Sequence, residues 1–172
     1  RIEAKWIDVF REIFDLCRVA PGDEVAILSE TQSRQVNVQL SELALRGIGA
    51  RVFHVVLPTP ELKNNIPVRS TGASDVLQKR APVIGALAQS TLVVDLTVEG
   101  LLHAPELPRI LEDGARIMMI SNEHPDALER LRPDEALRSV VQDAVRKAKA
   151  SREMTVTSET GTELTISLQG CP

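Results

Sequence analysis

Hydrophobic residues along this chain follow two alternating patterns, which predict helices and buried strands in turn. In the first segment, from about Ile2 to Arg18, Trp6, Phe10 and Phe14 recur at helical spacing. After a turn, Glu24–Ser29 is a short and nearly continuous apolar run, as in a strand that is covered on both faces. The chain therefore begins with a helix followed by a buried strand.

The same alternation continues through most of the sequence. The further elements that it predicts are a helix over about Ser33–Arg46 ended by Gly47, a strand over Arg51–Leu57, a helix over about Pro82–Gln89, a strand over Thr91–Leu96, a short helix near Pro105–Glu112, a strand over Ala115–Ile120 and a long helix over Pro133–Ser151. Buried strands separated by helices indicate a parallel sheet. We therefore expect an α/β fold, namely a doubly wound, mostly parallel four-stranded sheet with helices on both faces and strand order 2-1-3-4.

Two segments depart from this alternation. Residues Pro58–Ala81 contain prolines, asparagines and a glycine without a clear period, and a loop of that length in a compact domain is usually functional or mobile. Near the C-terminus, Met154–Ser158 and Glu163–Leu168 alternate apolar and polar residues on either side of a turn, which predicts a β-hairpin.

A lone hairpin leaves one apolar face uncovered and needs further strands or a helix against it. We therefore expect two domains, an N-terminal α/β domain over residues 1–152 and the start of a truncated, β-rich domain over residues 153–172. The uncovered face also favours a homo-oligomer.

Composition and charge exclude several classes of function. Aromatic residues make up only 2% of the 172 residues, which is a poor match to modules that stack bases on exposed rings. The formal net charge of −4 argues against general affinity for nucleic acid. No apolar run reaches the roughly 20 residues that span a bilayer. Cys17 and Cys171 lack any metal-binding spacing. We expect a cytoplasmic protein with free thiols and no nucleic-acid or membrane partner.

Polar residues follow three of the predicted strands, at the edge where open parallel sheets bind ligands. These segments are Ser29–Thr31, Thr97–Glu99 and Ser121–His124. No GxGxxG or GxxxxGK[ST] motif is present, which argues against a dinucleotide or P-loop site. The three histidines lie far apart in sequence and form no convergent ligand set, so we predict no metal site within this chain.

The segment Thr91–Glu106 contains the strongest candidate for chemistry, His103. Its imidazole follows a predicted strand end and can exchange a proton near neutral pH, so it is the candidate catalytic residue. Thr97 and Glu99 precede it on the same loop and are the candidate substrate-binding residues. Structural alternatives remain open, because a loop histidine can bond a backbone carbonyl and a loop carboxylate can simply be solvated.

Other polar residues have structural interpretations. Asp95 at a strand end is placed to bond the backbone of the next loop, and Thr31 or Ser33 could cap the second helix. His54 alternates with Val52 and Val56 on one strand face, which favours a satisfied sheet histidine over a catalytic one.

Four segments together resemble a known family. They read CRVAPGDEVAILSE, RVFHVVLP, LVVDLTVEGLLHAPE followed by ILEDGARIMMI, and TSETGTELTISL. They resemble the N-terminal half of 2,5-dihydroxypyridine 5,6-dioxygenase-like enzymes, a group related to the thermophilic aminopeptidase (aminopeptidase T) metallopeptidases. The most distinctive element is LLHAPE, which carries His103.

The resemblance implies a second, β-rich domain whose His and carboxylate residues bind Fe(II), where O2 opens the ring of a small dihydroxypyridine. Those ligands would lie beyond Pro172, so the chain alone should not be catalytically competent. His103 would then contact the substrate oxygen or move a proton from the α/β side. The resemblance also favours a homo-oligomer. Alternatives are the N-terminal domain of a metallo-aminopeptidase and a non-catalytic α/β binding module.

Overall fold

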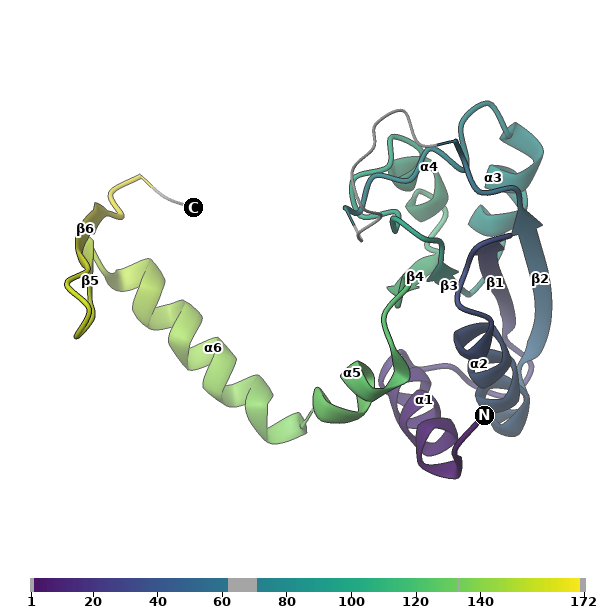
Figure 1. Cartoon of the computed structure of the whole chain (residues 1–172), viewed down its shortest axis with the longest axis horizontal. Coiled ribbons are helices and arrows are strands. Elements are labelled where there is room, and N and C mark those ends of the chain that lie inside the picture. The colour runs from purple at the N-terminus through teal and green to yellow at the C-terminus, as the bar shows by residue number, and fades with distance from the viewer. Residues whose placement is uncertain (1, 62–70, 133, 171–172) are drawn as a thin grey trace. The chain divides into compact units, whose positions relative to one another are not determined.

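The computed structural model of the protein describes residues 2–61, 71–132 and 134–170, which divide into two compact units, Arg1–Arg132 and Pro133–Pro172 (Figure 1). The first unit alternates helices and strands. Its elements are α1 (Ala4–Leu16), β1 (Glu24–Glu30), α2 (Gln35–Ile48), β2 (Arg51–Leu57), α3 (Ala81–Ala88), β3 (Leu92–Leu96), α4 (Leu107–Leu111), β4 (Arg116–Met119) and α5 (Pro125–Arg130).

The four strands form one parallel sheet in the order β2-β1-β3-β4. In its central register, Ala26 of β1 pairs with Phe53 of β2 and with Val93 of β3, and Val93 pairs with Ile117 of β4. This arrangement confirms both the predicted fold class and the predicted strand order. It also places the carboxyl ends of β3 and β4 side by side at one edge of the sheet.

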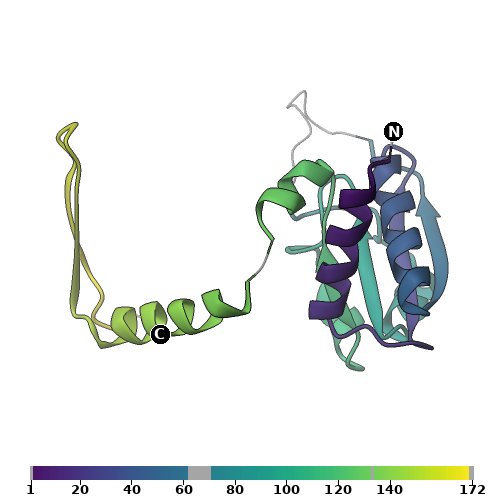
Figure 2. The same cartoon turned by 90° about the horizontal axis from the view of Figure 1, so that it is seen from below.

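Alternation along β1 divides the core into two layers, because successive side chains of a strand point to opposite faces. Val25 and Ile27 belong to a cluster with residues of α1 and α2, whereas Ala26 and Leu28 belong to a cluster with residues of α3 and α4. Figure 2 shows α1 and α2 lying together over one face of the sheet. Helices therefore cover both faces, as the sequence predicts.

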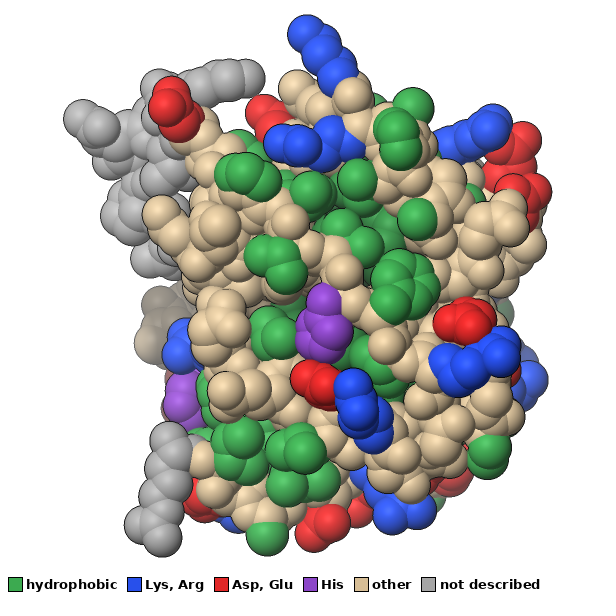
Figure 3. All heavy atoms as spheres, turned by 90° about the vertical axis from the view of Figure 1, so that its right-hand side faces the viewer, with side chains coloured by type: hydrophobic (Ala, Val, Ile, Leu, Met, Phe, Trp, Pro, Cys, Tyr) green, Lys and Arg blue, Asp and Glu red, His purple; other side chains and the backbone are tan. Residues whose placement is uncertain are grey.

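The edge strand β2 is less covered than the central strands. Figure 3 shows the side of the molecule on which β2 lies, with hydrophobic side chains between charged ones. Val56 is 60% exposed there, and His54 Nε2 lies 3.3 Å from Glu42 Oε2 on α2. His54 thus has a carboxylate partner, which fits its structural interpretation.

Two local expectations about α2 were wrong. The helix continues through Gly47 to Ile48, and Gly49 ends it with a left-handed φ of 96°, its N–H donating to the carbonyls of Leu45 and Arg46. Neither Thr31 nor Ser33 caps the helix, because the N-cap position is Arg34 and no side chain bonds there. The Ser33 hydroxyl instead accepts from the Glu30 N–H at 2.6 Å and donates to the Leu96 carbonyl at 2.7 Å.

The second unit contains α6 (Glu135–Ala150) and an antiparallel pair, β5 (Glu153–Thr157) and β6 (Glu163–Ser167). The pair is the predicted hairpin, and Met154, Val156 and Leu164 on it are exposed. This unit begins before α6, whereas the sequence placed the domain boundary after it, near residue 152. The functional boundary at 152 stays a prediction. In the part of the chain that the structure describes, no helix is both long and apolar enough to cross a bilayer.

Candidate functional site

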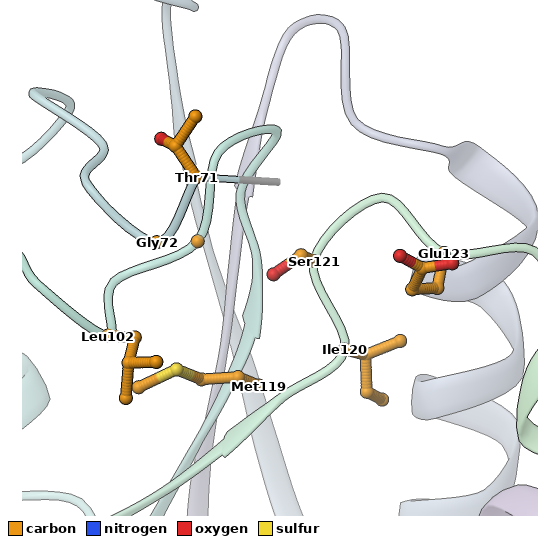
Figure 4. Close-up of a pocket in the computed structure, with 8 residues that line it drawn as sticks. Thr71, Gly72, Leu102, Met119, Ile120, Ser121 and Glu123 are labelled. Carbon is orange, nitrogen blue, oxygen red and sulfur yellow. The ribbon is translucent and has the colours of Figure 1, made fainter. Parts of the chain in front are cut away.

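A pocket of about 250 Å³ lies at the carboxyl ends of β3 and β4 (Figure 4). Three segments of the chain meet there: the loop after β3, the end of β4 with the turn that follows it, and the segment between β2 and α3. The residues that line it are Thr71, Gly72, Gly100, Leu102, Met119, Ile120, Ser121 and Glu123. This is the edge of the sheet where parallel α/β folds bind ligands.

Asp95, the fourth residue of β3, holds the loop that follows its own strand. Its Oδ1 accepts hydrogen bonds from the Thr97 N–H at 3.0 Å and from the Thr97 hydroxyl at 2.6 Å, and its Oδ2 accepts one from the Leu101 N–H at 2.8 Å. The prediction that Asp95 bonds the next loop is therefore confirmed. The Asp95 carboxylate thus ties both the start and the end of this loop to β3.

The pKa of Asp95 reflects how deeply this carboxylate is buried. Burial raises the pKa from its ordinary value of 3.8 to about 6, the hydrogen bonds from Thr97 and Leu101 oppose that rise, and the charge of Glu30 adds to it. Asp95 is 0% exposed, so its carboxylate is solvated by these protein groups rather than by bulk water.

Glu30, at the end of β1, is a second buried carboxylate. It is 1% exposed, and its Oε1 accepts from the Ser74 hydroxyl at 3.0 Å. Its Oε2 is buried with no partner in hydrogen-bond geometry among the described residues. Burial raises the pKa of Glu30, while Ser74, Thr59 and the backbone N–H of Val98 lower it.

Thr97 is fully buried, and its hydroxyl serves the loop in two ways. The hydroxyl donates to Asp95 Oδ1 and accepts from the Gly100 N–H at 3.1 Å. Its role as a substrate-binding residue stays a prediction. In this structure the buried Thr97 hydroxyl holds the loop by linking Asp95 to Gly100.

Glu99 joins the loop to the segment before α3. Its Oε2 accepts from the Thr71 N–H at 3.1 Å and from the Thr71 hydroxyl. The backbones run together as well, because the Gly72 N–H donates to the Glu99 carbonyl and the Ser74 N–H donates to the Gly100 carbonyl at 2.9 Å. Glu99 thus contacts Thr71, which lines the pocket. A contact between Glu99 and substrate stays a prediction.

His103 is exposed at the end of this loop. The backbone N–H of His103 donates to the Gly72 carbonyl, and a Cβ added at Gly72 would lie 3.2 Å from Cδ2 of the His103 ring. Within the described part of the chain, the imidazole has no hydrogen-bond or ion-pair partner. The loop therefore fixes the backbone of His103 and leaves its ring available. Leu102 lines the pocket directly and His103 follows it.

The turn after β4 completes the pocket. The Asp95 carbonyl accepts from the Ile120 N–H at 3.0 Å and from the Ser121 N–H at 2.9 Å, and Ser121 has a left-handed φ of 50°. In Figure 4 the Ser121 hydroxyl points into the pocket, with Glu123 beyond it. Asp95 therefore fixes two walls of the pocket, one through its side chain and the other through its backbone.

Comparison with known proteins identifies the family to which this site belongs. The profile of the 2,5-dihydroxypyridine 5,6-dioxygenase family matches residues 5–172. The chain belongs to this family. It is 30% identical over 163 residues to the 2,5-dihydroxypyridine 5,6-dioxygenase of Pseudomonas putida KT2440, and the match covers 93% of this chain and 45% of that protein.

The fold agrees with a solved member of the dioxygenase family. The structure of 2,5-dihydroxypyridine dioxygenase from Pseudomonas putida KT2440 matches with a TM-score of 0.81 at 28% identity, covering 98% of this chain and 48% of that one. The chain thus spans slightly less than half the length of these relatives. The matches named are to dioxygenases, and none of them supports the aminopeptidase or the non-catalytic alternative.

An iron site does not fit the described residues of this dioxygenase-family chain. They include no group of three or more His, Cys, Asp or Glu side chains placed to hold a metal ion. His54 lies beside Glu42 on the sheet edge, and His124 Nδ1 accepts from the Asp126 N–H at the start of α5. His54 and His124 therefore lie in separate parts of the fold, on β2 and at the start of α5.

Some of the pocket was not predictable from the sequence. Thr71 and Gly72 come from the aperiodic segment Pro58–Ala81, of which residues 62–70 lie outside the described part of the chain. The length of that segment was the available signal. Leu102, in the loop after β3, and Met119, the last residue of β4, could not be singled out from the sequence, because apolar residues at such positions are usually part of the core.

Proposed function

We propose that this chain is the α/β part of an Fe(II)-dependent ring-cleaving dioxygenase that acts on a dihydroxypyridine-type aromatic with O2. The observation that carries the proposal is the pocket beside His103 at the β3–β4 edge, in a chain of the dioxygenase family. Iron would be held by residues outside this chain, since the described residues do not form a site for it. The chain would supply substrate contacts and proton transfer.

His103 is suited to proton transfer because its backbone is held and its ring is available. The hydrogen bond from its N–H to Gly72 and the closed loop behind it limit where the imidazole can move. An imidazole held near a hydroxylated ring can donate to, or accept from, the substrate oxygen at neutral pH. Such general acid–base assistance typically contributes about 10²–10⁴ in rate.

Glu99 and Thr97 would support the same wall of the site. The Glu99 carboxylate borders the pocket through Thr71, where it can contact a polar group of the substrate. Thr97 would act through the loop, because its hydroxyl is engaged by Asp95 and Gly100. We further propose a homo-oligomeric, cytoplasmic enzyme, consistent with the exposed apolar residues of the hairpin.

The test is turnover by the full-length protein that contains this chain. Purified protein loaded with Fe(II) is mixed with 2,5-dihydroxypyridine, and both loss of substrate absorbance and O2 uptake are recorded. We expect one O2 consumed for each ring opened. Absence of substrate loss with iron fully loaded would contradict the proposal.

A further inference from the structure

Ser121 adopts a backbone conformation that a serine rarely takes. Three non-glycine residues in the described chain have a positive φ, and two of them, Arg18 and Lys79, are exposed. Ser121 is 6% exposed, with a φ of 50°. The left-handed conformation costs a residue with a Cβ about 1–2 kcal/mol, a cost that glycine avoids. A glycine would fit this turn with less strain but would carry no hydroxyl.

The strained turn aims the hydroxyl into the pocket. The N–H groups of Ile120 and Ser121 both donate to the Asp95 carbonyl, which turns the chain sharply at the end of β4. The Ser121 hydroxyl is not bonded to any described residue, whereas the other hydroxyl on the pocket wall, that of Thr71, donates to Glu99. Ser121 is therefore the pocket hydroxyl that remains available to a ligand.

The rest of the pocket suits a flat ring. Leu102, Met119 and Ile120 provide apolar surface. Gly72 lies directly against Leu102, and Gly72 and Gly100 line the pocket with backbone alone. Glu123 adds one carboxylate near Ser121. A cavity of about 250 Å³ is slightly below the usual range for drug-sized ligands, about 300–1,000 Å³, and fits a single small ring.

We propose that Ser121 is a specificity-determining residue whose hydroxyl hydrogen-bonds a ring hydroxyl group of the aromatic substrate while Leu102 and Met119 pack against the ring. This inference rests on the proposed function and adds to it the residue that recognises the polar substituent. A site built to bond a substrate hydroxyl discriminates against an analogue that lacks it, because its own polar group is then left unpaired.

The test compares Ser121→Ala and Ser121→Gly in the full-length, iron-loaded protein. Both variants lack the hydroxyl, and only the glycine variant relieves the strained φ. We expect both to raise KM for 2,5-dihydroxypyridine about tenfold, as loss of one hydrogen bond to a ligand would. We also expect Ser121→Gly to unfold at a higher temperature than Ser121→Ala. Lys79→Gly, which relieves an exposed positive φ, is the control whose KM should stay unchanged.

Binding without turnover gives the second readout. Under anaerobic conditions, the Kd values of 2,5-dihydroxypyridine and of the two monohydroxypyridines that each lack one of its ring hydroxyls are compared. Wild type should bind the dihydroxy compound more tightly than at least one analogue, and both Ser121 variants should lose most of that preference. If wild type turns over the substrate and both variants keep KM and the preference within twofold, Ser121 is only structural. If wild type neither binds nor turns over the substrate, this inference and the proposed function both fail.

Discussion

The carboxylate of Asp95 and the N–H of Leu101 are joined by a hydrogen bond of 2.8 Å that closes the loop after β3. The backbone carbonyl of Asp95 also accepts a hydrogen bond from the Ser121 N–H at 2.9 Å. One buried residue therefore holds the loop that carries His103 and the turn that carries Ser121. The geometry of the proposed site should depend strongly on Asp95, although it does not line the pocket.

The stability of the protein should respond to the titration of Asp95. Its pKa is about 6 in the folded state and near 3.8 when unfolded. Between pH 3.8 and pH 6 the folded state therefore carries more bound protons at Asp95 than the unfolded state does. By linkage, the contribution of Asp95 to the free energy of unfolding is largest below pH 3.8 and is lost as pH rises through about 6. From the size of the shift, that loss is on the order of 3 kcal/mol.

Asp95→Asn removes this titration while keeping the size of the side chain. Urea unfolding of wild type and variant between pH 4 and 8 should show the variant gaining stability relative to wild type as pH rises. Asp113→Asn, at an exposed aspartate, is the matched control. A stability difference for Asp95→Asn that stays constant over this range would contradict the assignment.

Thr97 should matter through its hydroxyl rather than its methyl group. Thr97→Val leaves one acceptor lone pair on Asp95 and the Gly100 N–H without their partner, in a site with no water access. We expect it to lower the free energy of unfolding by about 1–3 kcal/mol. Thr97→Ser keeps the hydroxyl and should lose clearly less. Equal losses in the two variants, measured by urea unfolding, would show that the hydroxyl contributes nothing.

Gly72 should be intolerant of any side chain. Its φ is +73°, and a Cβ there would lie 3.0 Å from Leu102 Cβ and 3.2 Å from His103 Cδ2. Gly72→Ala combines backbone strain with steric contact against Leu102 and His103. We therefore expect both a lower melting temperature and reduced ring-opening activity of the full-length protein.

Gly114→Ala is the control for backbone strain alone, because Gly114 also has a positive φ but has open space around it. It should lower the melting temperature and leave activity unchanged. Equal activity in the two alanine variants would mean that contact with Gly72 does not position His103.

The sequence predicts the scaffold well because the scaffold depends on local pattern. Buried strand runs and helical spacing predict the parallel sheet and its order, and a polar residue at a strand end predicts the bonding of Asp95. At the end of α2 the sequence predicted the wrong glycine, because Gly47 and Gly49 lie less than one turn apart and either could adopt the left-handed φ that Gly49 alone takes.

The pocket depends on contacts between distant segments, which leave no local pattern. Thr71 meets Glu99 and Gly72 meets His103 only because two loops lie side by side at the end of the sheet. The strained φ of Ser121 likewise depends on the carbonyl of Asp95 on the neighbouring strand. Position along the sequence indicated His103, and the fold was needed to show its surroundings.

The proposed enzyme depends on His103 acting on the substrate from the α/β side of the site. The most direct measurement is the ring-opening rate of full-length His103→Gln with 2,5-dihydroxypyridine, alongside its iron content, with His54→Gln on the sheet edge as the control histidine. We predict a fall in kcat of at least about tenfold for His103→Gln at unchanged iron content, with the control close to wild type. A His103→Gln rate within about twofold of wild type would show that His103 does not act on the substrate.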